Sequence, residues 1–582
     1  MNGLLLLGIA AVLFICAYVF YGRYLVKTWG IDVNADTPAK TCEDGEDFVP
    51  SNKWKVFAHQ FSSIAGAGPV TGPVMALMFG WLPAVLWIVI GGIFFGAVHD
   101  FGALYASVKS KGQSMGKIVE YNIGKTGKKL FFLFCWLFSL IVIAAFADMV
   151  SGTFNGFNAQ TGAKAVANGS AASISIFYVF GAILFGYITR KLDVKGWKQV
   201  VLGIVFVVVM LALGIKFPVF FGKQAWTYIV FVYIFFAAIT PIALMKQPRD
   251  YLTTFLFVGM IVAAMLGIVV SNPTITTPAF TGFKTQTGSY LFPTLFVTIA
   301  CGAVSGFHSL VSSETSSKQI ANEKDMLQVG YGSMLLESML AIVVIVVVGS
   351  LPSLAHSGVL NNALSSVALA DTATPFQKFA TGVTGLLDQL GMPQAWGLCI
   401  MTMFVSALAL TTLDAVARIA RMSLQELLEP TEGEASSVVK FITNKYVATF
   451  ITLLGGYLLS LGGYQNIWPL FGATNQLLAA MTLITLAVFM KVTGRKGFML
   501  YIPMVIMFAV TVSSLCLSIY NIVLKLFVTG GFVFMTDGLQ LLFAILLLAL
   551  GCMVAFKSGK KLKEVPSHGS SQMAFKAQDK AE

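Results

Sequence analysis

Ionisable residues interrupt several apolar stretches of this sequence, and their side chains are of the kinds that bind and release protons. His308 follows a glycine-rich run in GFHSL, Asp100 follows a histidine in GAVHDF, Glu337 stands in GSMLLESML, and Asp414 lies in LTTLDAVARIAR. An ionisable group inside an apolar span is costly, so it is expected to face a bundle interior and to serve a function. Because histidines and buried carboxyls can titrate near neutral pH, these residues are candidates to carry a coupling proton. The alternative is an ion pair or cap near the edge of the apolar layer.

Three hydroxyl residues precede Asp414 and form a weaker candidate site for Na⁺: Ser406, Thr411 and Thr412. They would act together with carbonyl groups freed by a broken helix, although helical Ser and Thr more often bond to their own backbone. The 7 cysteines include no CxxC pair and the 5 histidines no HExxH pattern, so we expect neither a metal centre nor a cofactor.

The stretch IAGAGPVTGP, at 64–73, breaks an apolar segment in its middle. Glycine costs about 1 kcal/mol and proline about 3 kcal/mol inside a helix, so the segment is expected to unwind here. Unwound backbone in a membrane must line a cavity or pack against protein, and glycines let a small solute approach it closely. The residues expected to contact such a solute are Gly66, Ala67, Gly68, Thr71 and Gly72.

A similar break occurs later in the chain. FSSIA at 61–65 matches FVTIA at 296–300, and GPVTG at 68–72 matches GAVSG at 302–306. The second run adds Gly302, Ser305 and Gly306 to the expected substrate contacts. Two similar broken spans in opposite orientation are typical of inverted-repeat transporters, whose substrates bind between the breaks. The alternative is a pair of simple kinks filled by neighbouring helices.

The composition places these elements in a membrane. Of 582 residues, 57% are hydrophobic and 11% charged, against about 25% charged in soluble proteins. Apolar runs predict an all-α polytopic membrane protein of about 15 transmembrane helices. The expected spans are 3–22, 57–79, 83–106, 130–151, 173–189, 199–217, 226–245, 253–271, 291–311, 329–351, 395–417, 446–463, 467–490, 499–524 and 537–556.

Most of the 38 Lys and Arg residues fall in alternate loops. The positive-inside rule then predicts an outside N-terminus and a cytoplasmic C-terminus. Because these charges are spread over loops, no nucleic-acid partner is expected. We expect an N-terminal transmembrane helix (1–23), a cytoplasmic loop (24–56), a transporter core (57–524), a C-terminal transmembrane helix (525–556) and a disordered basic tail (557–582). The longest outer loop is expected at 352–394.

Six motifs in order, between residues 54 and 490, carry a resemblance to a known family. They are FAHQFSSIAGAGPVTGP, GAVHDF, TIACGAVSGFHSLVSSETSSKQI, GYGSMLLE, TTLDAVARIAR and IWPLFGATNQLLAA. Together they resemble the carbon starvation protein A family of bacterial and archaeal membrane transporters. Glu314 stands where the family pattern often reads glycine.

The resemblance implies uptake of peptides or pyruvate across a prokaryotic plasma membrane under carbon starvation, driven by protons. It also implies a relation to the amino acid–polyamine–organocation superfamily, with five-helix inverted repeats. The spans near 57 and 291 would be that fold's first and sixth core helices, and 395–417 its eighth. Peptide and pyruvate, H⁺ and Na⁺ coupling, and the oligomeric state stay open.

Other functions remain possible on the sequence alone. A Na⁺-coupled symporter of another small organic solute, or a membrane nutrient sensor that does not transport, would share most of these features. A channel would lack accumulation against a gradient. An intramembrane enzyme is not expected, because the sequence contains no HExxH or GxSxG pattern, and ATP drive is not expected because no GxxxxGK[ST] pattern occurs.

Overall fold

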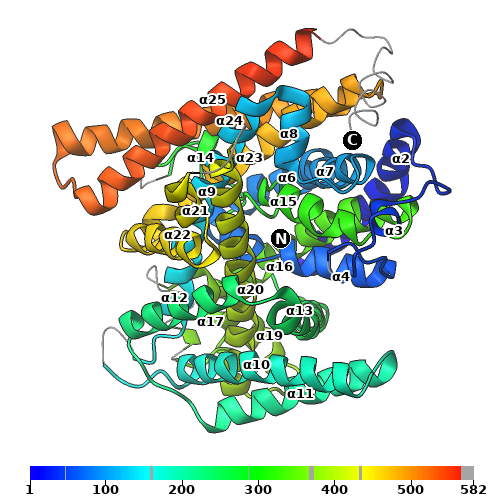
Figure 1. Ribbon diagram of the computed structural model, residues 1–582. Helices are drawn as coiled ribbons and strands as arrows, with labels where there is room; N and C mark the ends of the chain where they lie inside the picture. Colours follow the sequence, from blue (N-terminus) through cyan, green and yellow to red (C-terminus); the bar gives the residue numbers. More distant parts are fainter. Residues whose placement is uncertain are drawn as a thin grey trace.

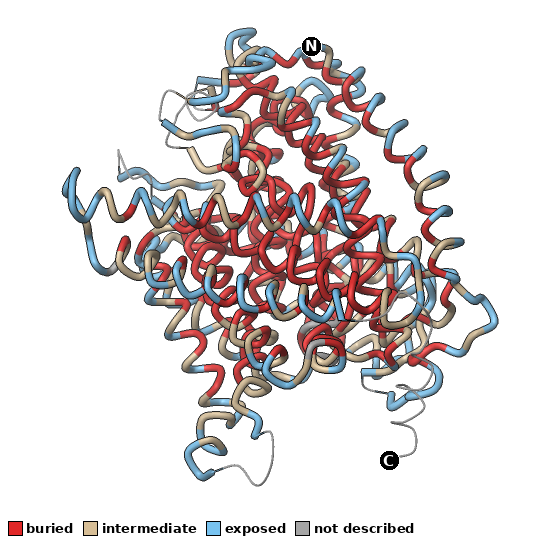
Figure 2. Tube along the Cα trace, turned by 90° about the horizontal axis from the view of Figure 1, so that it is seen from above, coloured by how far each residue is buried: buried red, intermediate tan, exposed pale blue. Residues whose placement is uncertain are grey.

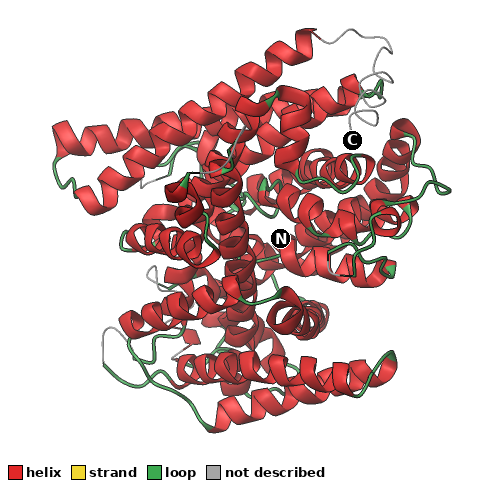
Figure 3. Ribbon diagram, viewed as in Figure 1, coloured by secondary structure: helices red, strands yellow, loops and turns green. Residues whose placement is uncertain are grey.

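The computed structural model is a bundle of helices (Figure 3). It describes residues 1–45, 47–157, 162–285, 288–362, 364–365, 373–430 and 436–564. Within these residues the only β-type contacts are isolated bridges, such as that between Asn2 and Thr274. The chain is therefore an all-helical protein in the part that the structure describes.

The helices follow the apolar runs of the sequence (Figure 1). The first half forms α1 (Gly3–Cys16), α2 (Arg23–Trp29), α3 (Pro38–Thr41), α4 (Lys53–Ile64), α5 (Gly68–Ala76), α6 (Trp81–Gly91), α7 (Ala97–Lys109), α8 (Met115–Ile123), α9 (Lys125–Thr153), α10 (Val166–Lys191), α11 (Trp197–Lys216), α12 (Lys223–Ile239) and α13 (Ile242–Ser271). The second half forms α14 (Leu291–Thr298), α15 (Phe307–Glu314), α16 (Ser333–Gly349), α17 (Leu351–His356), α19 (Pro375–Asp388), α20 (Gln394–Leu428), α21 (Ser437–Ile442), α22 (Lys445–Ser460), α23 (Tyr464–Val492), α24 (Phe498–Leu524) and α25 (Leu539–Glu564).

Eleven helices of the described chain are long and apolar enough to cross a membrane, or twelve if the bent pair α4–α5 counts as one span. Three further predicted spans coincide with shorter elements: α12 has 17 residues, α22 has 16, and α14 and α15 have 8 each. The chain is thus a polytopic membrane protein with at least these eleven spans, and the count of fifteen stays a prediction.

Burial separates helices of the interior from helices of the rim (Figure 2). The most apolar 18-residue stretch of α23 is 100% buried, whereas the corresponding stretch of α11 is 22% buried. The open face of α11 consists of aliphatic side chains, including Val201, Ile204 and Val208. An exposed aliphatic face of this size is stable against lipid rather than water.

The first break is shorter than the sequence predicts. Only residues 65–67 leave the helix, and α5 begins at Gly68, so the GPVTG run is helical. Pro69 lies in the first turn, where its fixed φ suits a helix and its missing N–H is no loss. The expectation that the whole of GAGPVTGP unwinds is therefore wrong. The two half-helices meet at a bend of 46°.

The second break is longer. Helix α14 ends at Thr298 and α15 begins at Phe307, so residues 299–306, including the whole GAVSG run, are non-helical. The matched motifs thus adopt different backbone conformations, and only the second leaves its run of small residues unwound.

Two predicted surface segments contain additional helix. The outer loop expected at 352–394 includes α19, whose apolar face is buried against the core. Its start has a capping box between Thr374 and Gln377, with Pro375 in the first turn. The basic tail expected to be disordered from 557 is helical up to Glu564, and its residues 565–582 lie outside the described part, as does Glu46 of the acidic loop.

Candidate functional site

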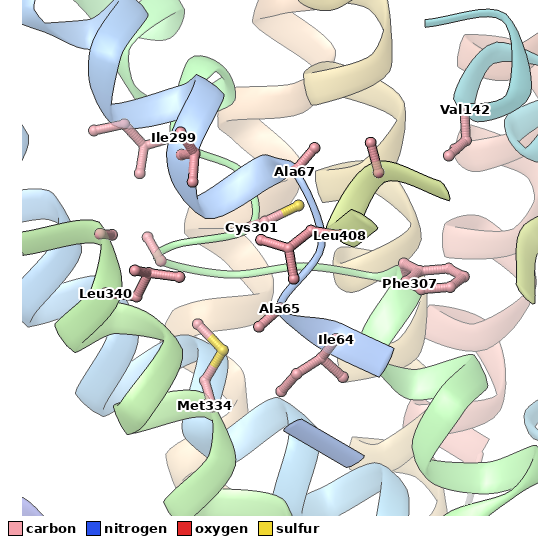
Figure 4. Packing of buried hydrophobic residues seen from close by; sticks show 14 of the residues in the cluster. Ile64, Ala65, Ala67, Val142, Ile299, Cys301, Phe307, Met334, Leu340 and Leu408 are labelled. Atoms are coloured by element: carbon pink, nitrogen blue, oxygen red, sulfur yellow. The ribbon is translucent and has the colours of Figure 1, made fainter. Parts of the chain in front are cut away.

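The two breaks cross each other in the interior (Figure 4). A Cβ built on Gly68 would lie 2.6 Å from Cys301 Cβ, and one built on Gly72 would lie 2.6 Å from the carbonyl oxygen of Thr298. Gly68 thus faces Cys301, and Gly72, further along the first segment, faces the earlier residue Thr298. The two segments therefore run in opposite directions where they touch. Only glycine permits this approach, because any side chain would meet backbone or the base of a side chain.

Helix α20 completes one wall of the crossing. Its Thr412 lies so close to Gly66 that a Cβ on the glycine would be 3.3 Å from Thr412 Cβ. A cavity of about 20 Å³, room for about one water molecule, lies at this point. It is lined by Ile64, Gly66, Gly68, Phe138, Val142, Phe146, Cys301, Phe307, Thr412, Phe471 and Asn475. The lining residues come from both breaks and from α9, α20 and α23.

Asn475 of α23 holds the start of α15. The Phe307 N–H donates to Asn475 Oδ1 at 3.1 Å, the Gly306 N–H donates to the Asn475 carbonyl at 3.1 Å, and Asn475 Nδ2 donates to Ser305 Oγ at 3.0 Å. The first two bonds satisfy backbone N–H groups at a helix start, which have no partner within the helix. The N–H groups at the start of α15 are therefore partly occupied by protein, and the starts of both half-helices line the cavity, α5 through Gly68 and α15 through Phe307.

Sequence reasoning did not nominate Asn475 as a site residue. The signal was present, because the pair Asn475-Gln476 interrupts an otherwise apolar span and both side chains are fully buried. Gln476 donates to the carbonyl oxygen of Phe296 in α14, so this polar pair contacts both halves of the second broken helix.

Three of the predicted proton carriers lie in contact, together with a fourth residue. Asp100 Oδ1 lies 2.8 Å from His99 Nδ1, and Asp100 Oδ2 lies 2.8 Å from His308 Nδ1. His308 Nε2 lies 3.3 Å from Glu337 Oε2. All four side chains are fully buried. We call His99, Asp100, His308 and Glu337 the buried cluster.

Close helix packing positions the buried cluster. Helices α7 and α16 each follow a π-helical turn, at Gly92–Gly96 and Leu327–Gly332, and such turns are frequent at functional sites. A Cβ on Gly330 would lie 2.8 Å from Phe101 Cα, and one on Gly96 would lie 2.8 Å from Met334 Cε. These glycines let the two helices approach, which brings Asp100 and Glu337 to the same histidine.

Asp414 lies outside the buried cluster and belongs to a second polar group. It forms an ion pair with Arg249 of α13 and accepts a hydrogen bond from Tyr233 Oη at 2.8 Å. Arg249 is 2% exposed although the sequence places it among loop charges. Arg418, one turn after Asp414, instead donates to the carbonyl oxygens of Ala237 and Thr240. No pattern in the sequence singled out Arg249, because a lone arginine beside an apolar run looks like a flanking charge.

The hydroxyl candidates for Na⁺ point in different directions. Thr411 and Thr412 are adjacent, so their side chains are about 100° apart around the helix. Thr412 lines the cavity, while Thr411 accepts a hydrogen bond from Arg249 Nη2 at 3.3 Å. Ser406, Thr411 and Thr412 each donate to the carbonyl oxygen four residues earlier.

The other nominated residues lie at the breaks and differ in their surroundings. Thr71 is fully buried, and its hydroxyl has no hydrogen-bond partner among the described protein groups. A Cβ on Gly302 would lie 2.8 Å from Ala341 Cβ of α16. Ala67 forms the last residue of the first break and packs near Cys301 (Figure 4). The role of each as a substrate contact stays a prediction.

These features define a multi-pass helical membrane protein with a small internal cavity between two broken helices and a buried titratable cluster beside it. The chain belongs to the family described as carbon starvation protein CstA, whose model matches residues 2–366 and 355–514. It is therefore a membrane transporter by family rather than an enzyme.

Two relatives carry names that refer to different solutes. The chain is 32% identical over 550 residues to "Peptide transporter CstA" of Escherichia coli (strain K12), covering 85% of this chain and 78% of that protein. It is 32% identical over 559 residues to "Pyruvate/proton symporter BtsT" of the same organism, and the match covers 81% of this chain and 75% of that protein.

Among solved structures, the chain aligns with the Eremococcus coleocola manganese transporter at 10% identity and a TM-score of 0.49, over 90% of this chain and 99% of that one. It aligns with MhsT in complex with L-phenylalanine at 11% identity and a TM-score of 0.44, over 88% of this chain and 99% of that one.

Proposed function

We propose that the chain is a secondary active uptake transporter that couples the entry of a peptide or of pyruvate to protons. The observation that carries the proposal is the adjacency of the buried cluster to the cavity. Phe307 lines the cavity and His308, the next residue, contacts both Asp100 and Glu337. A proton bound at His308 therefore acts on the half-helix whose first residue faces the substrate space.

The substrate would bind between the breaks, against Gly66, Gly68 and the Cys301 segment, and alternating access would enlarge the cavity toward one side at a time. The cavity lining carries no charged side chain among the described residues. A dipeptide needs an acceptor for its ammonium group as well as donors for its carboxylate, because an unpaired charge is costly to bury. The lining thus supports the smaller substrate of the two.

Proton coupling has more support than Na⁺ coupling. The hydroxyl of Thr411, one of the three Na⁺ candidates, is already bonded to the cationic Arg249. The buried cluster, by contrast, offers two imidazoles and two carboxyls in one chain of contacts.

Two ion pairs support the proposed alternation of the spans, while the orientation, with the N-terminus outside and the C-terminus in the cytoplasm of a prokaryotic cell, rests on the positive-inside rule. Lys109 pairs with Glu323 at 2.5 Å, and both belong to loops expected inside. Lys223 pairs with Asp148 at 2.7 Å, and both belong to the side expected outside.

Uptake into proteoliposomes tests the proposal. Labelled pyruvate and a labelled dipeptide are supplied separately, each with an inward proton gradient, with the gradient collapsed by an uncoupler, and with protein-free vesicles as background. We expect accumulation of one of them above the outside concentration only while the gradient exists. Accumulation that persists without a proton gradient and requires a Na⁺ gradient would replace the proposal by the Na⁺-coupled alternative.

A further inference from the structure

We infer that the exchangeable proton of the buried cluster is held between His308 and Glu337, whereas Asp100 stays a carboxylate that orients both histidines. This inference rests on the proton-coupled function proposed above and gives the members of the cluster separate roles. It follows from which atoms face each other within the cluster.

Asp100 bonds to two imidazoles at once. Each of its oxygens lies 2.8 Å from the Nδ1 atom of one ring, His99 on one side and His308 on the other. An ionised carboxylate only accepts hydrogen bonds, so it can accept from both rings. A protonated carboxyl would have to donate one of these bonds instead, and the site would lose a charge-assisted bond. The arrangement therefore stabilises the anion, with a hydrogen on Nδ1 of each ring.

This assignment determines what the far side of His308 presents to Glu337. If Nδ1 carries a hydrogen, a neutral ring has only a lone pair at Nε2. Nε2 lies 3.3 Å from Glu337 Oε2, and a lone pair facing a carboxylate at this distance would be repelled. At least one proton must then reside on the pair, either on Nε2 or on the carboxyl group. A proton can thus move between His308 Nε2 and the carboxyl group of Glu337.

Glu337 has few other ways to be stabilised as an anion. Both of its carboxyl oxygens are buried and have no hydrogen bond to any described protein group. A buried carboxylate without hydrogen bonds is costly unless a cation lies beside it. Glu337 can therefore be ionised only while His308 is an imidazolium, and in that state the pair holds one proton. The loaded pair holds a second proton, on the carboxyl group, so that neutral Glu337 lies beside cationic His308 and anionic Asp100.

The surroundings separate this pair from the other ionisable groups. His99 contacts Asp100, and its Nε2 has no hydrogen bond to any described protein group, so His99 is a second ring held by the same anion. The thiol of Cys301, in the linker before α15, also interacts electrostatically with Glu337 and Asp100. Release of a proton from the pair leaves net negative charge where α15 meets α16, next to the cavity.

Infrared difference spectroscopy on the full chain in lipid vesicles tests the assignment without any transport. We expect a pH-dependent carbonyl stretch of a protonated carboxylic acid that shifts in D₂O. Glu337→Gln should remove this band and Asp100→Asn should leave it. Asp193→Asn is the matched control, because Asp193 is an exposed carboxylate at a positive φ that asparagine tolerates. Loss of the band in Asp100→Asn but not in Glu337→Gln, or no such band in the unmodified protein, would overturn the inference.

Transport of the same variants gives the second readout. Glu337→Gln should lower the gradient-driven accumulation ratio to one while downhill exchange of the labelled solute stays measurable. Asp100→Asn should lose both the accumulation and the downhill exchange, because the imidazole rings of His99 and His308 lose the carboxylate that orients them. A Glu337→Gln protein that accumulates like the unmodified one refutes the inference. His308→Gln is the further variant: with its partner gone, Glu337 should keep its acid band to higher pH.

The two proposals fail in different ways. If the unmodified protein shows no proton-dependent accumulation, the proposed function fails, and the infrared experiment still decides where the proton resides. If accumulation is proton-dependent but Glu337→Gln does not affect it, only the assignment of the proton fails.

Discussion

Gly72 of the first broken helix lies against the backbone of Thr298 at the second break: a Cβ on Gly72 would be 2.6 Å from the Thr298 carbonyl oxygen and 3.2 Å from Ile299 Cα. The contact joins two segments 226 positions apart in the chain. Because the neighbour is backbone, it cannot move aside as a flexible side chain would. The two breaks therefore have to shift together or not at all.

Gly72→Ala should accordingly impair transport. We expect a loss of stability of about 1–3 kcal/mol, as for overpacking in a dense interior, and a strong fall in uptake. Thermal unfolding of the detergent-solubilised protein and uptake into vesicles measure the two effects. Gly8→Ala is the matched control, because a Cβ at Gly8 meets nothing within 4 Å. If Gly72→Ala transports as well as Gly8→Ala, the crossing is not tight in the working protein.

The ion pair of Arg249 and Asp414 makes a separate prediction about stability. Removing one partner of a buried pair leaves an unpaired charge and typically costs about 3–5 kcal/mol. We expect Arg249→Met and Asp414→Leu each to lower the melting temperature strongly, and the double variant to recover part of the loss. A thermal-shift assay on the purified protein measures all three.

The exposed pair of Lys195 and Asp193 serves as the comparison for that experiment. Their side chains are 78% and 77% exposed, so removal of either charge should change stability by at most about 1 kcal/mol. If the losses of stability in Arg249→Met and Asp414→Leu simply add up in the double variant, the two residues do not stabilise each other in the folded protein.

The sequence predicted the elements of this fold well where composition decides them. Long apolar runs such as α9 and α24 needed no tertiary information, because a bilayer requires about 20 apolar residues per helix. The sequence also indicated both breaks. It misjudged their extents, because GPVTG and GAVSG look alike and neither run shows the long-range contacts of the second break, such as the bond of Ser305 to Asn475, 170 positions away.

The site was only partly predictable for the same reason. Asp100, His308 and Glu337 were nominated singly, since ionisable residues in apolar spans are functional candidates by default. Their mutual contact depends on the packing of α7, α15 and α16, which periodicity does not reveal. Asp414 was nominated on the same grounds and lies elsewhere, paired with Arg249. Helix α19 was missed because its apolar residues are too few for a span, although its capping box was readable.

Asn475→Ala should loosen the second break. The variant removes the side-chain bonds to the Phe307 N–H and to Ser305 Oγ, which leaves buried polar groups unpaired at about 1–3 kcal/mol. We expect a lower melting temperature and faster hydrogen exchange of residues 299–309, measured by mass spectrometry. Asn466→Ala is the control, because Asn466 only bonds to a carbonyl in its own segment. Unchanged exchange at 299–309 would show that Asn475 does not hold α15.

Cys301 offers a direct test of where the substrate binds. Its thiol lines the cavity between the breaks, and among the described cysteines it is the one that does so. In vesicles that are transporting, we expect a small maleimide to alkylate Cys301 slowly, and a saturating concentration of the accumulated solute to slow the reaction further. Peptide mass spectrometry quantifies each cysteine separately in one sample.

Cys399 is buried outside the cavity and Cys42 is exposed in a loop, so the solute should alter neither rate. Equal protection of Cys301 and Cys399 would mean that the solute changes the conformation without occupying the crossing, and no protection at Cys301 would place the substrate elsewhere.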